Sequence, residues 1–228
     1  MKHLYIVVEG ETESEFINQL VIPYFVSQDI ITHIQPIIIK KSGGGHGYDN
    51  IEHLKNTIEP LLYYKNEPII TTFIDHYGIN SVRKLPNYEF CSQKQETEER
   101  IKCMEDNLFE IINSIKNYPF FIPNIIRHEI ETLFLSNPKD GFDLQLDKIK
   151  EDVIELCSQF ESVEDINHTL ENAPSKRLER IYENNKQKYA KVVDGIQIAE
   201  LTGIETILEK CPRFKKWLDK LIIELQKS

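Results

Sequence analysis

Acidic residues follow three apolar segments of this chain, each at the point where the segment ends. Glu9 and Glu13 follow HLYIVV, Asp75 ends PIITTFID, and Glu129 and Glu131 follow FFIPNIIR. Carboxylate oxygens are the ligands that hard cations such as Mg²⁺ and Mn²⁺ prefer, and such cations assist phosphoryl transfer. For any one of these groups, a solvated acid or a helix cap is the ordinary alternative. Their joint occurrence favours a site for Mg²⁺ or Mn²⁺ made by Glu9, Glu13, Asp75, Glu129 and Glu131.

Apolar and helical segments alternate in the first part of the chain. Gly10 permits a tight turn after the first apolar segment, and Thr12 with Glu15 predicts a capping box that opens a helix. The alternation predicts crossover connections and a parallel sheet, so the expected fold class is α/β. Ligands bind such sheets at the carboxyl ends of the strands, where Glu9 and Asp75 fall. The predicted elements are strands at 3–8, 33–40 and 68–75 and, after the flexible connector SGGGHGYDN, a helix at 51–64.

The rest of the chain is predicted to be largely helical. Residues 88–118 predict one long helix. Pro123 predicts that the next apolar stretch is an edge strand or a bulge, and a short helix then stops near Pro138. From Asp147 onward the pattern is helical, with breaks at NAPSKR, DGIQ, LTGI and CPRF. The predicted domains are an α/β metal-binding domain at 1–140 and a helical C-terminal extension at 141–228 packed on it.

The last helical segment, CPRFKKWLDKLIIEL, separates apolar from basic positions. Its apolar side chains recur at helical spacing, which predicts core contacts rather than stacking on nucleic-acid bases. The lysines between them predict a basic face that is usually solvated but could meet nucleic acid or an acidic partner. The apolar positions are Phe214, Trp217, Leu218 and Leu221, and the basic ones are Lys215, Lys216 and Lys220.

Composition and charge narrow the class of protein. The 228 residues, 40% hydrophobic and 28% charged, are typical of an ordinary globular protein. The apolar runs are too short to cross a bilayer and the start lacks a signal-peptide pattern, so we expect a cytoplasmic location without membrane contact. The net charge of −10 opposes general attraction to nucleic acid, so a polyanion would need a local basic patch or a bound cation.

The four cysteines have no CxxC spacing, which predicts reduced structural thiols. They are Cys91, Cys103, Cys157 and Cys211.

Three further residues could take part in chemistry. His128 could be a metal ligand, a general acid or base, a structural donor or a plain surface residue; Mg²⁺ sites seldom recruit imidazole, so acid–base or supporting roles rank above ligation. Lys176 and Arg177 lie at a predicted helix start, where backbone N–H groups and the helix dipole favour an anion. They are candidates for phosphate contact, with a solvated helix end as the alternative. The segment KKSGGGHG lacks the residue order of a P-loop, so no nucleotide site is expected there.

Five motifs occur in a characteristic order along the chain: VVEGETESEF, TTFIDHYG, FIPNIIRHEIETLFLSNP, VEDINHTLENAPSKRL and CPRFKKWLDKL. With these motifs the sequence resembles the DUF4276 family of small Toprim-like proteins over nearly its whole length. The resemblance implies a Toprim-like Rossmannoid parallel sheet flanked by helices, with a helical C-terminal region. Toprim domains of topoisomerases, primases and OLD-type nucleases carry a strand-end Glu and an Asp-x-Asp pair that bind Mg²⁺. The resemblance therefore implies a metal-dependent enzyme acting on phosphodiesters, and specifically a nuclease.

The resemblance assigns roles to individual acids. Glu9 matches the first Toprim Glu, Glu13 matches the second acid of the EGxxE turn in OLD-type nucleases, and Asp75 matches the first Asp of the pair. The second Asp is replaced by Tyr77, whose phenol is a poor Mg²⁺ ligand at neutral pH, so the sequence departs from the usual two-metal arrangement. If HEIE were extended, its two glutamates would share one face and could replace the missing carboxylate.

Three possible functions follow from the acids and the resemblance. The first is a nuclease that hydrolyses DNA or RNA with Mg²⁺ or Mn²⁺; the resemblance implies an effector of prokaryotic anti-phage defence that acts with an AAA or ABC-type ATPase. The second is a catalytically degenerate regulatory subunit of such an ATPase, which Tyr77 favours and the retained, mutually repelling acids oppose. A phosphatase or nucleotidyl transferase with the same metal site is a third. The sequence does not distinguish DNA from RNA as the substrate, or a monomer from a homo-oligomer.

Overall fold

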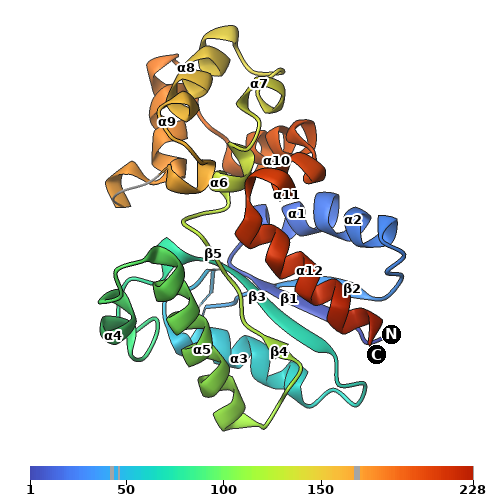
Figure 1. The fold of residues 1–228 in the computed structure, drawn as a ribbon. Helices are drawn as coiled ribbons and strands as arrows, with labels where there is room; N and C mark the ends of the chain where they lie inside the picture. Colours follow the sequence, from blue (N-terminus) through green and yellow to red (C-terminus); the bar gives the residue numbers. More distant parts are fainter. Residues whose placement is uncertain (42–43, 46, 167–169, 228) are drawn as a thin grey trace.

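A parallel β-sheet forms the centre of the protein (Figure 1). The computed structural model describes residues 1–228 except 42–43, 46, 167–169 and 228. The sheet has five strands in the order β2-β1-β3-β4, and β5 pairs with β3 beyond β4. All pairs are parallel, which confirms the predicted α/β class. The strands are β1 (Leu4–Val8), β2 (Ile34–Ile38), β3 (Ile69–Asp75), β4 (Phe121–Ile122) and β5 (Ile125–Ile126).

The central strand β1 is buried over its whole length because helices cover both faces of the sheet. Leu4, Ile6 and Val8 enter one hydrophobic core, and Tyr5 and Val7 enter the other. This alternation follows from the two-residue period of a strand. One face is covered by α1 (Glu11–Phe16), the π-helical segment η1 (Ile17–Val21), α2 (Ile22–Ser27) and α12 (Pro212–Gln226), and the other by α3 (Ile51–Leu62) and α5 (Thr97–Ile115).

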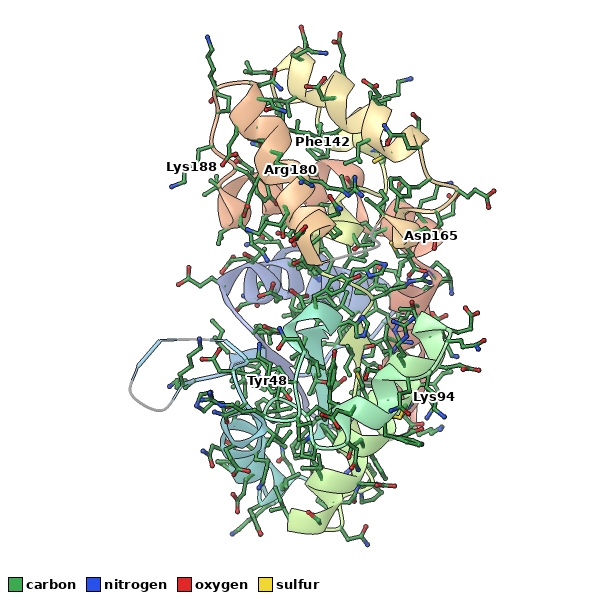
Figure 2. All side chains as sticks on the ribbon, turned by 90° about the vertical axis from the view of Figure 1, so that its left-hand side faces the viewer. Tyr48, Lys94, Phe142, Asp165, Arg180 and Lys188 are labelled. Carbon is green, nitrogen blue, oxygen red and sulfur yellow. A yellow bond between two sulfur atoms is a disulfide. The ribbon has the colours of Figure 1, made fainter. Side chains whose placement is uncertain are left out.

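The C-terminal half first leaves the sheet and then returns to it (Figure 1). Helices α7, α8 and α9 form a group beyond the carboxyl ends of the strands, with Phe142 fully buried among them (Figure 2). The chain then returns to α12, where the ring of Trp217 stacks on Phe73 of β3 with centroids 5.0 Å apart. The boundary at 140 stays a prediction, although α12 completes the core of the N-terminal sheet. These helices are α6 (Glu131–Phe134), α7 (Pro138–Gly141), α8 (Asp147–Ser158), α9 (Pro174–Asn184), α10 (Lys191–Thr202) and α11 (Ile204–Lys210).

Three details of the predicted helices are wrong. Helix α1 begins at Glu11 with Gly10 as its N-cap and no side-chain cap, so the expected capping box of Thr12 and Glu15 does not form. The break expected at DGIQ lies inside α10, because Gly195 packs against Phe134 and needs no bend in the chain. Residues 88–118 form two helices instead of one, α4 (Tyr88–Ser92) and α5.

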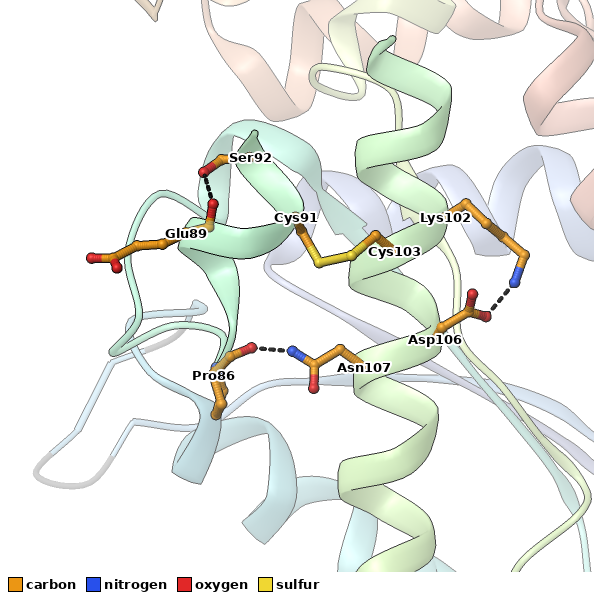
Figure 3. The surroundings of a disulfide bond; sticks show 8 residues. All are labelled: Pro86, Glu89, Cys91, Ser92, Lys102, Cys103, Asp106 and Asn107. Atoms are coloured by element: carbon orange, nitrogen blue, oxygen red, sulfur yellow. Dashed lines mark hydrogen bonds and ion pairs between the residues drawn. A yellow bond between two sulfur atoms is a disulfide. The ribbon is translucent and has the colours of Figure 1, made fainter. Parts of the chain in front are cut away.

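A disulfide joins these two helices (Figure 3). Cys91 of α4 and Cys103 of α5 are bonded with their Cα atoms 5.5 Å apart. The prediction of four reduced thiols is therefore wrong for this pair, because the turn between α4 and α5 brings together cysteines whose spacing matches no motif. Cys157 and Cys211 are free.

Three other predictions concern regions away from the acidic residues. None of the described helices is long and apolar enough to cross a membrane. The connector SGGGHGYDN falls partly outside the described residues, at 42–43 and 46. Phe214, Trp217, Leu218 and Leu221 are buried, which confirms their predicted place in the core.

Candidate functional site

The carboxyl ends of β1 and β3 bring the first two acids together. These strands are neighbours in the sheet, with Val8 opposite Phe73. Glu9 follows β1, and its Oε1 accepts a hydrogen bond of 2.8 Å from the backbone N–H of Asp75. A Cβ at Gly78 would lie 2.8 Å from the same oxygen, so the absence of a side chain there makes room for Glu9. The sheet register thus produces the pairing that the strand-end positions predicted.

Glu13 and Glu131 meet at a lysine from the C-terminal half. The ammonium of Lys191, the first residue of α10, lies 3.2 Å from Glu131 Oε1 and 3.9 Å from Glu13 Oε1. The side chain of Glu131 is completely buried and that of Glu13 is 5% exposed, whereas Lys191 is 41% exposed. The ammonium therefore closes the open side of a buried pair of carboxylates.

Glu129 is held at the start of α9. Its Oε2 accepts a hydrogen bond of 3.0 Å from the backbone N–H of Ser175, in the first turn of that helix. Free N–H groups and the positive end of the helix dipole favour an anion at this position. The helix start that was predicted to bind phosphate thus binds a carboxylate of the protein itself.

These five residues form one electrostatic cluster, which we call the acidic cluster. Glu9 interacts with Glu13 and Asp75, and Asp75 interacts with Glu129. Lys191 acts on every member of the cluster. The structure therefore gathers at one end of the sheet acids that are more than 120 positions apart in the sequence: Glu9, Glu13, Asp75, Glu129 and Glu131.

Burial makes several of these acids hold their protons near neutral pH. It raises the pKa of Glu9 to about 7, although the hydrogen bond from Asp75 opposes the shift. It also raises the pKa of Glu131 to about 7 against the influence of Lys191, and it raises the pKa of Asp75 well above its usual range. Burial alone would lower the pKa of Lys191, but the surrounding carboxylates, Glu131 foremost, raise it. The cluster holds more potential negative charge than its one lysine neutralises.

The acidic cluster has the donor chemistry for a hard divalent cation. Both carboxylate oxygens of Glu131 and Oδ1 of Asp75 are buried without a hydrogen bond among the described residues, although Lys191 forms an ion pair with Glu131. Oxygen atoms in this condition are stabilised by a cation. In the described part of the chain, no group of three or more His, Cys, Asp or Glu side chains is placed so that it could hold a metal ion without rearrangement. The residues fit Mg²⁺ or Mn²⁺ by type, and Lys191 is the cation that they hold now.

The HEIE segment is bent, so the extended arrangement that would put its two glutamates on one face does not form. His128 has a positive φ of 68°, and Glu131 already begins α6. The two glutamates consequently have different partners, Ser175 for Glu129 and Lys191 for Glu131. A left-handed residue at 128 redirects the chain, which a strand pattern does not reveal.

His128 is buried and supports the local structure. Its Nε2 lies 2.7 Å from the backbone oxygen of Glu164, so this nitrogen carries the proton and donates it to the carbonyl. Its ring stacks on that of Tyr77 with centroids 5.3 Å apart. Tyr77, at the position where the Toprim resemblance implies an Asp, is therefore used in packing. Nearby, burial lowers the pKa of His76 to about 4, so that ring is neutral at physiological pH.

Lys176 and Arg177 contact residues that do not belong to the acidic cluster. Lys176 Nζ lies 2.6 Å from Glu179 Oε2 on the same helix. Arg177 donates from Nε to the backbone oxygen of Asn172 at 2.9 Å, and its guanidinium lies over the ring of Phe160. Among the described residues neither cation forms an ion pair with the acidic cluster, and phosphate contact by them stays a prediction.

Two cations near the acids were not predicted. Lys191 lies in the part of the chain whose pattern is helical almost throughout. Nothing in the segment KYAKVVDG distinguishes this lysine as one that contacts a carboxylate nearly 180 positions away. Lys84 also acts electrostatically on Glu9, and its backbone oxygen accepts a hydrogen bond from the hydroxyl of Tyr48. Only the tertiary fold supplies these contacts.

Comparison with known proteins identifies the family but no characterised relative. No curated protein and no solved structure matches the chain. One family model, described as a domain of unknown function, DUF4276, matches residues 8–222, which include the whole acidic cluster and Lys191. On this match over nearly its entire length, the chain belongs to the DUF4276 family.

Proposed function

We propose that this protein is a nuclease that uses Mg²⁺ or Mn²⁺ to hydrolyse phosphodiester bonds in DNA or RNA. The observation that carries the proposal is the acidic cluster, in which burial raises the pKa of Glu9, Asp75 and Glu131 beside Lys191. Acids that are kept buried despite mutual repulsion are typical of functional sites. Their position at the carboxyl ends of parallel strands is where α/β proteins bind ligands.

The residues of the cluster have complementary roles in this proposal. A bound divalent cation would neutralise charge on the phosphate and favour attack by water. Glu9, Glu13, Asp75, Glu129 and Glu131 would hold it. In the cation-free protein the pKa of Glu9 and that of Glu131 lie near 7, so binding of the cation would release the protons that these carboxyls hold at neutral pH. Lys191, partly exposed at the edge of the cluster, supplies positive charge for a phosphate oxygen.

The family resemblance extends the proposal to partners. Similarity to Toprim and OLD-type proteins supports phosphodiester chemistry, and it supports a cytoplasmic effector of anti-phage defence that acts with an AAA or ABC-type ATPase. These elements rest on analogy of fold and motif, whereas the cation site rests on the residues themselves.

A specific observation favours a second function, that of a regulatory subunit without catalysis. Lys191 already compensates part of the charge of Glu13 and Glu131, and Tyr77 is packed on His128 instead of offering a carboxylate. In this alternative the acidic cluster is a structural ion-pair network that fixes α1, α6 and α10 relative to one another.

Cation binding and cleavage can be measured together to separate the two functions. The protein, Glu9→Gln and a control Glu11→Gln would be titrated with Mn²⁺ by calorimetry and incubated with plasmid DNA and bulk tRNA. Glu11 is exposed at the first position of α1, two residues after Glu9, so its variant removes the same charge outside the cluster. We expect the protein and Glu11→Gln to bind Mn²⁺ and cleave, and Glu9→Gln to lose cleavage by a factor of at least about 100, as for removal of a group that acts in the transition state.

The outcomes assign the function. Binding without cleavage in the wild type supports the regulatory subunit, or an enzyme that needs its ATPase. No binding of Mn²⁺ at millimolar concentration contradicts the cation site, and cleavage that survives in Glu9→Gln contradicts the role of the cluster.

A further inference from the structure

A groove lies along β4, at the edge of the sheet between α5 and α12 (Figure 1). Its volume is about 470 Å³, and the acidic cluster contributes no residue to its lining. Phe109, Phe120, Phe121, Ile122 and Trp217 give it a largely apolar surface, and Phe109 is 38% exposed. The groove is therefore a second concave surface, separate from the proposed active site, and of the size that binds ligands.

The outward-facing backbone groups at the edge of the sheet have different hydrogen bonds at β4 and at β5. The N–H of Ile70 donates to the oxygen of Phe120 at 3.0 Å, so by the alternation of a parallel ladder the carbonyl of Phe121 faces away from β3. Further along, the outward groups of Ile125 are both bonded: its N–H to Glu105 at 2.9 Å and its oxygen to Arg213 at 3.1 Å. At β4 the outward N–H of Phe121 is bonded to the oxygen of Tyr118 at 3.3 Å, and within the described residues its outward carbonyl has no hydrogen-bond partner.

The charges around the groove are unequally paired. Each carboxylate of its lining has a cation: Arg213 for Glu98 and Glu105, Lys102 for Asp106, and Lys227 for Glu224. Lys216 and Lys220 of α12 also line the groove, and within the described residues neither ammonium has an ion pair or a hydrogen bond. Four positions apart on a helix, the two lysines share one side and present uncompensated positive charge.

We propose that this groove binds an extended acidic peptide segment of a partner protein, laid beside β4. The apolar floor matches the apolar side chains of such a segment, the outward carbonyl of Phe121 can accept from one of its backbone N–H groups, and the two free ammonium groups match its carboxylates. Single-stranded nucleic acid fits less well, because its phosphodiester backbone has no N–H group to donate to the edge carbonyl. The proposal is independent of the nuclease activity.

The experiment uses the full chain and a display library of random eight-residue peptides. Selection on the wild type, with the double variant Lys216→Glu/Lys220→Glu as the counter-selecting protein, should enrich peptides rich in Asp and Glu with apolar residues between them. Trp217, the single tryptophan of the chain, lines the groove and reports binding through its fluorescence. We expect the double variant to weaken the best peptide at least about tenfold, the effect of losing about 1.4 kcal/mol.

A matched control and two competitors decide the outcome. Lys210→Glu/Lys215→Glu changes the same charge at exposed residues that are already paired with Glu209 and Asp219, so it should leave affinity within about twofold. Methylation of one backbone nitrogen of the peptide should weaken binding if it pairs with the strand. The proposal is overturned if no acidic sequences are enriched, if they bind the groove variant equally well, or if an eight-nucleotide oligothymidine binds more tightly than the best peptide.

Discussion

Replacing Lys191 by Met removes the cation that forms ion pairs with the buried Glu13 and Glu131 of the acidic cluster. Met keeps the length and the apolar stem of lysine, so the change isolates the charge. In the native protein the ammonium lies 3.2 Å from Glu131 Oε1, and Glu131 has no exposed side-chain surface. The variant leaves a fully buried carboxyl group without an opposite charge.

The magnitude depends on pH, and the sign follows from the pKa of Glu131. Its folded-state pKa of about 7 lies above the ordinary 4.5, and without Lys191, which lowers it, the pKa rises further. At pH 5.5 the group is protonated with or without the lysine, so the change in unfolding free energy should stay below about 1 kcal/mol. Above pH 7 the folded variant keeps a proton that the unfolded chain has released, and its stability falls as pH rises. Loss of one partner of a buried pair costs about 3–5 kcal/mol, and since Lys191 is 41% exposed, screening reduces the expected loss at pH 8.5 to about 1–3 kcal/mol.

Urea unfolding followed by Trp217 fluorescence at pH 5.5, 7.0 and 8.5 measures this difference. Lys188→Met is the matched control, because Lys188 is exposed three residues away (Figure 2). It should change stability by less than about 0.5 kcal/mol at every pH. A loss for Lys191→Met that is the same at all three pH values, or no larger than that of the control, would refute the ion-pair reasoning.

Two further predictions concern packing and covalent structure. Cys91→Ser should lower the unfolding free energy by about 3 kcal/mol under oxidising conditions, because the disulfide closes a loop between residues 12 apart. Reductant should cause the same loss in the wild type, whereas the control Cys157→Ser should not. A wild-type stability that does not change with reductant would contradict the bond. Gly195→Ala should destabilise by about 1–3 kcal/mol and lower Tm by about 3–10 °C in a thermal melt, since the new Cβ would lie 2.7 Å from the ring of Phe134; an unchanged Tm would show that α6 and α10 can separate freely.

The sheet could be predicted because its signals are local. The buried runs that end at Glu9 and Asp75 are short, rich in β-branched residues and separated by helical segments, and this pattern alone fixes parallel pairing. The errors arose where tertiary contacts decide. Residues 88–118 are helix-permissive throughout, but the bond from Cys91 to Cys103 holds a turn within them. Gly195 suggests a break in isolation and proves to be a contact point of one helix with another.

The acids of the site were likewise predictable, and their partners were not. Strand-end position identified Glu9 and Asp75, and the structure joins them by a hydrogen bond. Which amide holds Glu129, and which cation reaches Glu131, depends on helices from the second half of the chain. Those contacts span 46 residues in one case and about 60 in the other, and no local period encodes them.

Lys191 also gives a physical criterion for choosing between the two proposed functions. A divalent cation that enters the acidic cluster meets an ammonium already paired with Glu131, and like charges at such distances repel by several kcal/mol even at an effective dielectric constant of about 20. If the cluster is a cation site, removing Lys191 should tighten Mn²⁺ binding by about tenfold or more, even if cleavage is lost with it. If the cluster is a structural ion-pair network, Lys191→Met should destabilise the fold, and Mn²⁺ should not restore its stability. The first outcome is measured as the affinity for Mn²⁺ and the second as the free energy of unfolding. The same variant therefore distinguishes a nuclease site from a structural network without any assumption about the substrate.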